Sequence, residues 1–266
     1  MKKKLLWILL IALWVACSTV PLTGRQQINL IPTSTMLNMS FQQYDQFLQQ
    51  HNLSNDASQS RMVKRVGENI AQAVETYMRQ NNMSSEIDNY AWEFNLIESD
   101  QVNAFCMPGG KVVVYEGILP IAKDETGLAV IVGHEIAHAI AEHGNERMSQ
   151  MLVTQLGGMA LSKALEEKTE LTQQLWMSAY GIGTQLGVLL PYSRLHESEA
   201  DKLGLIFMAM AGYDPRAAAD FWQRMSDEKG GASPPEFLST HPSDQTRIQK
   251  IKQALPEALK YYQSNN

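Results

Sequence analysis

The sequence predicts a mainly α-helical domain with one small β-sheet, an α+β fold. Three observations support this prediction: two long stretches near the start with apolar residues at helical spacing, two short extended stretches between residues 90 and 115, and a helical pattern from Gly117 almost to the end. The chain has 266 residues, of which 44% are hydrophobic, so a core of ordinary size can form. We expect one folded domain over residues 36–266.

The charge and the cysteine content exclude two classes of protein. The formal net charge is −6, which argues against a general nucleic-acid binder because such proteins need basic surfaces to neutralise phosphates. Two cysteines, Cys17 and Cys106, are too few for a disulfide scaffold. We expect Cys106 to be a small buried hydrophobic residue, the alternative being a thiol within reach of oxidants.

Residues 1–16 are interpreted as a signal peptide. Three lysines precede an apolar run from Leu5 to Ala16, which is too short for a comfortable membrane span of ~20 residues. Ala16 directly before Cys17 resembles the lipobox of bacterial lipoproteins, which implies cleavage before Cys17 and lipidation of that residue. A plain signal peptide or an uncleaved anchor is the alternative. By analogy with enterobacterial sorting, Ser18 favours the outer membrane, with the protein facing the periplasm.

The next segments are a connection and two helices. Residues 17–35 contain Pro, Thr and Gln and are expected to form a tether or a strap on the domain surface. Residues 36–50 and 57–80 are predicted amphipathic helices. In the second of these, the apolar residues at three- and four-residue spacing are Val63, Val66, Ile70, Val74 and Tyr77.

Two strands and a helical remainder follow. Residues 90–98 alternate apolar and polar side chains and are predicted to form a half-buried strand; residues 111–115, after a Pro-Gly-Gly turn, are a second strand. Residues 181–190 are interpreted as the end of a buried helix. We expect the helical breaks near Gly144, Gly157-Gly158, Pro191, residues 212–215 and residues 230–235. No repeat of 20 to 50 residues is visible, so a helical-repeat domain is not expected.

The segment VIVGHEIAHAI at residues 130–140 contains the pattern H-E-x-x-H. On a helix, His134 and His138 project from one face, so both imidazoles can reach one metal ion. Zinc is favoured because it accepts imidazole and carboxylate ligands in a tetrahedron with one open position. Glu135 is then placed to take a proton from zinc-bound water. The alternative, a pair of core histidines, is disfavoured because burying these groups without a metal costs desolvation energy.

A third ligand is expected downstream. The metzincin continuation of H-E-x-x-H is absent, and His143, one residue out of its register, is interpreted as a polar residue near the helix end. Glu197 and Asp201 lie four apart on another predicted helix. Glu197 is the candidate ligand, and Asp201 can accept the outer N–H of a ligating histidine. Glu199 is expected to point to solvent.

Together these patterns resemble a known family. The motifs His134-Glu135-x-x-His138, Glu197-x-x-x-Asp201 and His241-Pro242-x-x-x-x-Arg247 are similar to those of the zinc metallopeptidases related to HtpX, the CAAX prenyl protease and BepA. The resemblance spans roughly residues 18–255 and implies a zincin-like fold. It implies one zinc ion on His134, His138 and Glu197, with Glu135 as the general base.

The resemblance also assigns the remaining candidates. Asp201 matches the assisting acidic residue. His241 matches a histidine near the metal, which either stabilises the transition state or occupies the open site in a latent form. Because the chain lacks the transmembrane helices of some relatives and the repeats of BepA, it resembles a minimal, lipid-anchored member.

These residues indicate hydrolysis of peptide bonds. His241 or Arg247 could supply a second positive charge to the oxyanion. The stretch from Asn103 through Ala104 and Phe105 to residue 115 resembles the family's strand and turn before the metal helix, where an exposed edge could bind a peptide by strand addition. The alternative is that residues 111–115 form a core strand.

The predicted function is a zinc endopeptidase acting on unfolded or misassembled envelope proteins. The expected partners are polypeptide substrates and the membrane, reached through the lipid on Cys17, and no nucleic acid is expected. One alternative is an envelope chaperone or assembly lipoprotein with a latent or weakly active zinc site. Another is a structural envelope lipoprotein with coincidental motifs. The oligomeric state is not indicated by the sequence.

Overall fold

The fold is known from a computed structural model, which describes residues 17–20, 22–156, 176, 193–228, 236–241 and 245–263. Several sequence predictions lie outside these residues. They are the signal peptide at residues 1–16, the breaks at Gly157-Gly158, Pro191 and residues 230–235, the helix end at residues 181–190, and Pro242 of the third motif.

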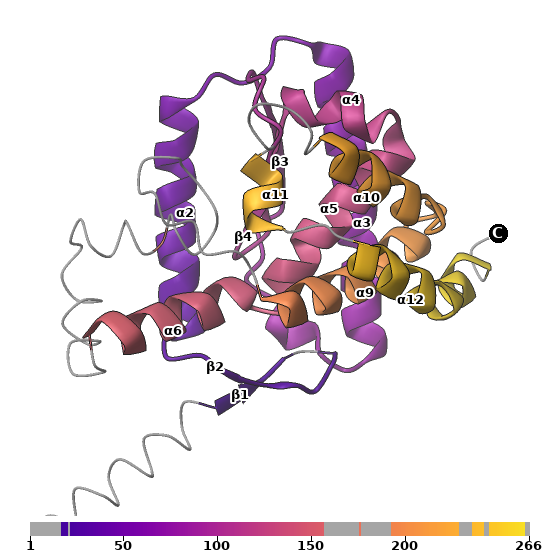
Figure 1. The fold of residues 1–266 in the computed structure, drawn as a ribbon. Helices are drawn as coiled ribbons and strands as arrows, with labels where there is room; N and C mark the ends of the chain where they lie inside the picture. The colour runs from indigo at the N-terminus through magenta and orange to yellow at the C-terminus, as the bar shows by residue number, and fades with distance from the viewer. Residues whose placement is uncertain are drawn as a thin grey trace, which may run out of the picture.

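The described elements are mostly helices around a small sheet, which confirms the predicted α+β fold (Figure 1). In chain order they are β1 (Cys17–Thr19), β2 (Gln26–Ile28), α2 (Thr33–Gln50), α3 (Ala57–Gln80), the 3₁₀ helix η1 (Ser84–Glu86), β3 (Glu93–Ile97), β4 (Ala104–Met107), β5 (Lys111–Tyr115), the 3₁₀ helix η2 (Glu116–Ile118), α4 (Leu119–Ala122), α5 (Glu125–Ile140), α6 (His143–Leu156), α9 (Arg194–Met210), α10 (Ala217–Asp227), α11 (Glu236–Thr240) and α12 (Gln245–Gln263).

The main sheet has the strand order β3-β5-β4, with β3 parallel and β4 antiparallel to β5. Both predicted strands are confirmed, the first as β3 and the second, with its predicted bounds, as β5. Because β5 lies between two neighbours, residues 111–115 form a core strand rather than an exposed edge. The edge on this side is β4, whose four residues are all buried.

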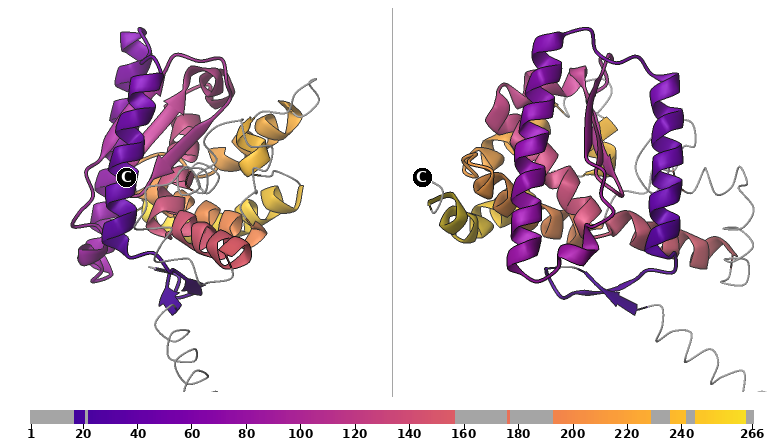
Figure 2. Two further views of the ribbon diagram at one scale, coloured as in Figure 1. Left: turned by 90° about the vertical axis from the view of Figure 1, so that its left-hand side faces the viewer. Right: turned by 180° about the vertical axis from the view of Figure 1, so that it is seen from behind.

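The sheet is covered on both faces. Successive side chains of a strand point to opposite faces. Val112 and Val114 of β5 therefore pack in a core with α3 and α5, whereas Val113 and Tyr115 pack in a second core with α2 and α6. Seen from behind, α3 and α2 stand on either side of the strands (Figure 2). Cys106 of β4 is buried, as predicted, and burial raises the pKa of its thiol.

The helix α5 lies at the centre of the molecule (Figure 1). Residues 127–140 are all buried, which fits a stretch that is apolar apart from His134, Glu135 and His138. Its start is set by Asp124, whose carboxylate accepts a hydrogen bond from the main-chain nitrogen of Gly127 (2.9 Å). It packs against α9, α3 and β4, and these contacts hold its motif residues in fixed positions.

The remaining predicted helix boundaries can be compared with those in the structure. The helix predicted over residues 57–80 has those bounds, and α2 begins at Thr33, three residues before its predicted start. The break expected near Gly144 is confirmed, since α5 ends at Ile140 and α6 begins at His143. The chain turns between the two helices at Glu142, which adopts φ +55°. The break over residues 212–215 is confirmed, because α9 ends at Met210.

Residues 17–20 and 22–32 form what we call the N-terminal strap. Strands β1 and β2 pair as an antiparallel hairpin, and Val20 and Gln27 are buried. The strap contacts α6 through β2. Of the two interpretations of this segment, the structure therefore supports a strap on the domain surface rather than a free tether. Among the described helices, none combines the length and the hydrophobicity needed to span a membrane.

Candidate metal centre

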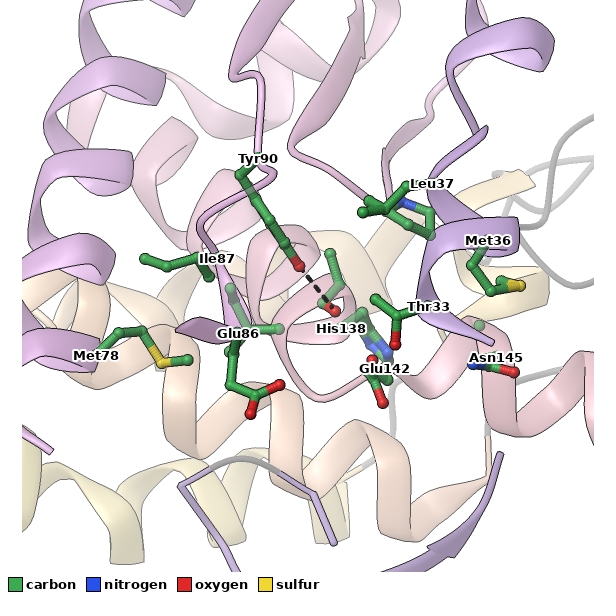
Figure 3. Close-up of a pocket in the computed structure, with 14 residues that line it drawn as sticks. Thr33, Met36, Leu37, Met78, Glu86, Ile87, Tyr90, His138, Glu142 and Asn145 are labelled. Atoms are coloured by element: carbon green, nitrogen blue, oxygen red, sulfur yellow. Dashed lines mark hydrogen bonds between the residues drawn. The ribbon is translucent and has the colours of Figure 1, made fainter. Parts of the chain in front are cut away.

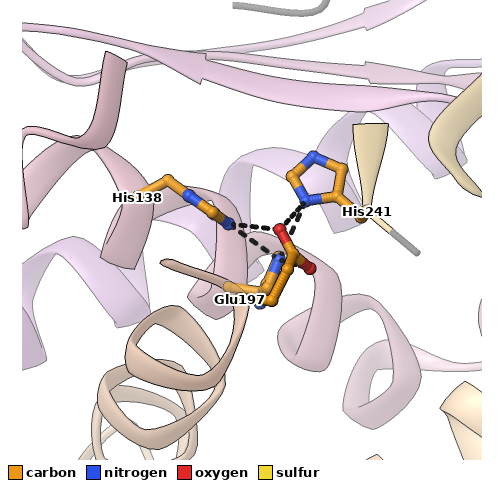
Figure 4. Close-up of side chains that lie close together, drawn as sticks. His138, Glu197 and His241 are labelled. Atoms are coloured by element: carbon orange, nitrogen blue, oxygen red, sulfur yellow. Dashed lines mark hydrogen bonds and ion pairs between the residues drawn. The ribbon is translucent and has the colours of Figure 1, made fainter. Parts of the chain in front are cut away.

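Four buried side chains from three parts of the chain meet at one point. His134 and His138 lie one turn apart on α5, Glu197 lies in the first turn of α9, and His241 directly follows α11. One ligand atom from each lies within 4.8 Å of the others. Figure 4 shows His138, Glu197 and His241 converging from their three segments.

The distances between the ligand atoms suit one tetrahedral ion. His134 Nε2 is 3.0 Å from His138 Nε2 and 3.2 Å from His241 Nδ1. Glu197 Oε1 is 3.0 Å from His241 Nδ1 and 3.3 Å from His138 Nε2. Zinc–ligand bonds of ~2.0–2.1 Å at the tetrahedral angle place ligand atoms roughly 3.3 Å apart. The cluster therefore fits the single zinc ion that the sequence predicted.

The hydrogen-bond partner of His134 determines the tautomer of its ring, and therefore which ring nitrogen can bind a metal. His134 Nδ1 lies 3.0 Å from Asp201 Oδ1. A carboxylate only accepts, so Nδ1 carries the proton and Nε2 presents a lone pair. Asp201 thus has the position that the sequence predicted for it.

His138 is oriented in the same way, through a histidine. Its Nδ1 lies 2.9 Å from His143 Nδ1, and His143 Nε2 lies 3.0 Å from Glu199 Oε2. Burial lowers the pKa of His143 to about 4, so this imidazole is neutral near pH 7. It donates to Glu199 from Nε2 and accepts at Nδ1. His138 therefore donates from Nδ1 and presents a lone pair at Nε2.

These assignments form the test of fit for a metal. The Nε2 atoms of His134 and His138 are both lone-pair acceptors, yet they lie 3.0 Å apart in a buried site beside the carboxylate of Glu197. A cation between them satisfies all three groups, and imidazole with carboxylate is a donor set that zinc accepts.

Arg247 and the acidic residues of α9 form one buried ion-pair group. Arg247 Nη1 lies 2.6 Å from Glu197 Oε2, and Nε and Nη2 donate to Asp201 at 2.9 and 2.8 Å. The guanidinium carbon also lies 3.4 Å from the ring centroid of Trp222. Burial opposes ionisation of Glu197, but Arg247 and His241 outweigh it and hold the pKa of that carboxyl well below its usual value. Arg247 therefore contacts the carboxylates of Glu197 and Asp201. A role for Arg247 in stabilising a transition state stays a prediction.

Glu135 is buried beside the cluster. Its Oε1 has no hydrogen-bond partner among the residues that the structure describes, and His241 Nε2 lies 3.5 Å from it. Burial, the largest effect, raises the pKa of Glu135 to about 7. A carboxyl group with a pKa near neutrality and one unpartnered oxygen is suited to accept and return a proton near pH 7.

The structure also shows residues whose roles the sequence analysis missed. His143 is fully buried against His138, and Glu199, expected in solvent, is only 8% exposed and pairs with His143 and with Arg25 of the strap. The expectation for Glu199 is therefore wrong, because α6 and the strap cover that face of α9. The available signal was a third histidine five residues after His138.

Asn103, Ala104 and Phe105, the predicted substrate contacts, are all buried. The side chain of Asn103 accepts from the main-chain nitrogen of Ala104 (2.9 Å). Phe237 of α11 donates its main-chain N–H to the carbonyl of Val102 (3.1 Å), which ties the segment carrying His241 to the start of β4. Contact of these three residues with a substrate stays a prediction.

A separate pocket lies behind the metal centre, between α2, α3 and the end of α5 (Figure 3). His138 contributes to its wall, and the Tyr90 hydroxyl donates to the main-chain carbonyl of Ala139 there (3.4 Å). His134, Glu197 and His241 are not among its lining residues. Of the four cluster residues, His138 is therefore the one that this pocket shares with the metal centre.

Comparison with known proteins places this geometry in a family. The family model described as "Peptidase family M48" matches residues 59–255. The mitochondrial metalloendopeptidase OMA1 of Schizosaccharomyces pombe is 39% identical over 175 residues, which cover 65% of this chain and 50% of that protein. The mitochondrial metalloendopeptidase OMA1 of Bos taurus is 30% identical over 252 residues, covering 92% of this chain and 47% of that protein.

A bacterial relative is more distant. The beta-barrel assembly-enhancing protease of Escherichia coli K12 is 27% identical over 178 residues, which cover 59% of this chain and 33% of that protein. The chain spans about half or less of the length of the curated relatives it matches. The shared part includes the ligand-bearing helices α5 and α9.

Proposed function

This chain belongs to peptidase family M48, and from that premise we propose that it is a zinc-dependent endopeptidase. Membership confirms the resemblance that the three sequence motifs indicated. The observation that carries the proposal is the free carboxylate oxygen of Glu135 beside a cluster of four metal-binding side chains.

The residues divide the work as follows. His134, His138 and Glu197 hold the zinc ion, which when bound polarises a peptide carbonyl and makes water more acidic. Glu135 takes the proton of the attacking water as the new C–O bond forms, and it gives that proton to the leaving nitrogen as the C–N bond breaks. Asp201 keeps the proton of His134 on Nδ1, which holds the opposite nitrogen ready for the metal.

The test is replacement of Glu135 by Gln, which keeps the size of the side chain and removes its basicity. We expect casein cleavage to fall by at least about a hundredfold, with one zinc per chain retained by elemental analysis. Glu125→Gln, at the exposed start of the same helix, is the matched control and should cleave at the wild-type rate. Cleavage retained by Glu135→Gln would overturn the proposed mechanism.

The substrates and the location are a further part of the proposal. We propose that the chain is made with a signal peptide over residues 1–16, is lipidated on Cys17 and acts in the bacterial envelope, at the outer membrane facing the periplasm, on unfolded or misassembled proteins. The support is the sequence of the first 18 residues and the name of the E. coli relative. Membrane fractionation of the wild type and of Cys17→Ala tests this, since only the wild type should sediment with the outer membrane.

A second candidate is an envelope chaperone or assembly factor with a latent or weakly active site. The observation that favours it is His241 Nδ1, which takes part in the cluster as a fourth ligand atom, since closed four-ligand zinc sites are structural rather than catalytic. If this candidate is right, cells carrying Glu135→Gln should assemble envelope proteins as well as the wild type does. Loss of assembly in that variant would favour the protease.

A further inference from the structure

Arg25, in the N-terminal strap, reaches across the surface of the domain to two buried carboxylates. Its Nε lies 2.8 Å from Glu199 Oε2, and its Nη2 lies 2.8 Å from Glu146 Oε2. Nη1 also donates to Glu146 Oε1 (3.2 Å). The Arg25 side chain is only 18% exposed. A planar guanidinium presents five N–H donors in a fixed fork, so Arg25 can engage both carboxylates at once.

Each of these carboxylates also receives a histidine. His143 Nε2 lies 3.0 Å from Glu199, and His196 Nε2 lies 3.0 Å from Glu146. The two imidazole rings stack with centroids 4.4 Å apart. The five side chains come from the strap, α6 and α9, so the group joins three segments that are far apart in sequence.

One branch of this group ends on a metal ligand. Arg25 donates to Glu199, Glu199 accepts from His143, and His143 accepts from His138. Thr23, also in the strap, donates its hydroxyl to the other oxygen of Glu199. In this series His143 donates from Nε2 to Glu199 and accepts at Nδ1 from His138 Nδ1. The proton of His138 is therefore on Nδ1, and the lone pair on its Nε2 faces the cluster.

We propose that Arg25 is a positioning residue of the metal centre: through Glu199 and His143 it sets the tautomer and the ring orientation of the zinc ligand His138. The inference rests on the proposed function, because it takes His138 to be a zinc ligand. It makes the strap part of the working enzyme, although the strap lies outside the residues that match the family model.

The charges of the group explain why Arg25 is needed. Glu199 is only 8% exposed, and its carboxylate accepts hydrogen bonds from His143, Thr23 and Arg25. Without Arg25, this buried carboxylate loses the guanidinium that pairs with it, which is unfavourable. Glu199 then gains by moving toward water or by holding His143 less firmly. Either change releases His143 and therefore His138.

The simpler alternative is that Arg25 only clips the hairpin to the domain. Both ideas predict a loss of stability when Arg25 is replaced, so stability does not separate them. The two hypotheses differ in the zinc affinity that they predict for the Arg25 variants. If Arg25 only attaches the hairpin to the domain, its replacement should leave the zinc affinity unchanged.

The experiment measures zinc affinity of the full chain by competition with a chromogenic chelator, and the visible absorption spectrum of the cobalt-loaded protein. The variants are Arg25→Gln and Arg25→Lys, with Arg65→Gln as the matched control, since Arg65 pairs with Glu125 on the exposed surface. Loss of an outer partner of a metal-bound histidine typically weakens metal binding 10- to 100-fold. We expect Arg25→Gln to bind zinc about tenfold more weakly and to shift the cobalt bands, Arg25→Lys to lie between it and the wild type, and Arg65→Gln to match the wild type.

A double variant keeps the proposal testable whatever the stability of Arg25→Gln. If Arg25 acts through His143, adding Arg25→Gln to His143→Phe changes zinc affinity no further. Additive effects overturn the proposal, and so does a folded Arg25→Gln with wild-type affinity and spectrum. A wild-type chain that binds no zinc overturns the proposed function itself, whereas equal binding by the wild type and Arg25→Gln overturns only the role of Arg25.

Discussion

Gly133 and Gly204 face each other where α5 crosses α9. A Cβ placed on Gly204 would lie 2.9 Å from the main-chain nitrogen of His134 and 3.0 Å from the carbonyl carbon of Gly133. The two helix backbones therefore touch beside the first metal ligand. This contact sets how far Glu197, two turns earlier on α9, lies from His134.

Gly204→Ala should separate the two helices. The added methyl group meets main-chain atoms, which cannot rotate away, so we expect a loss of about 1–3 kcal/mol in the free energy of unfolding. Zinc affinity should fall as well, because Glu197 moves away from the two histidines. Urea unfolding and chelator competition measure the two effects. An unfolding midpoint equal to that of the wild type would show that the crossing has room for the methyl group.

Arg247→Met should destabilise the protein strongly. The substitution keeps an apolar contact with Trp222 but leaves the buried carboxylates of Glu197 and Asp201 without their cation. Removing one partner of a buried ion pair costs about 3–5 kcal/mol, and urea unfolding measures it. Arg216→Met, which breaks an exposed pair with Asp214, is the control and should unfold like the wild type. An equal free energy of unfolding for Arg247→Met and Arg216→Met would contradict a stabilising role of the buried ion pairs of Arg247.

His241→Phe tests the fourth ligand position. Phenylalanine can keep the stacking of His241 on Phe237 (centroids 4.6 Å apart) while removing the nitrogen that lies among the ligand atoms. If His241 occupies the fourth position, zinc affinity falls and casein cleavage rises, which is the outcome we expect from the cluster geometry. A fall in kcat at unchanged zinc affinity would instead assign His241 to the stabilisation of the transition state.

Ionised Glu146 should stabilise the protein in a way that depends on pH. Burial raises its pKa, but hydrogen bonds from His196 and Arg25 outweigh this and lower the pKa from 4.5 to about 2. Because the folded-state pKa lies below the unfolded value, the stabilisation is complete above pH 4.5 and is lost as the pH falls toward 2. The difference in unfolding free energy between the wild type and Glu146→Gln should therefore shrink as the pH is lowered from 6 to 3. A constant difference over that range would contradict the ion pair with Arg25.

Much of the metal site could be predicted because its pattern is local. On a helix, residues four apart share a face whatever surrounds them, so the spacing of His134 and His138, and of Glu197 and Asp201, carries its own geometry. The strand over residues 111–115 and the helix over residues 57–80 were likewise readable from alternation and from helical periodicity.

What the sequence by itself determined, then, is the set of elements and the residues that can bind zinc and move a proton. The tertiary structure alone decided that Glu199 turns away from solvent, that residues 111–115 lie inside the sheet, and that Arg25 reaches His138 through two other side chains. The physical reason is distance along the chain. Arg25 and Glu199 are 174 residues apart, and their contact depends on how the strap, α6 and α9 pack, which no local period encodes.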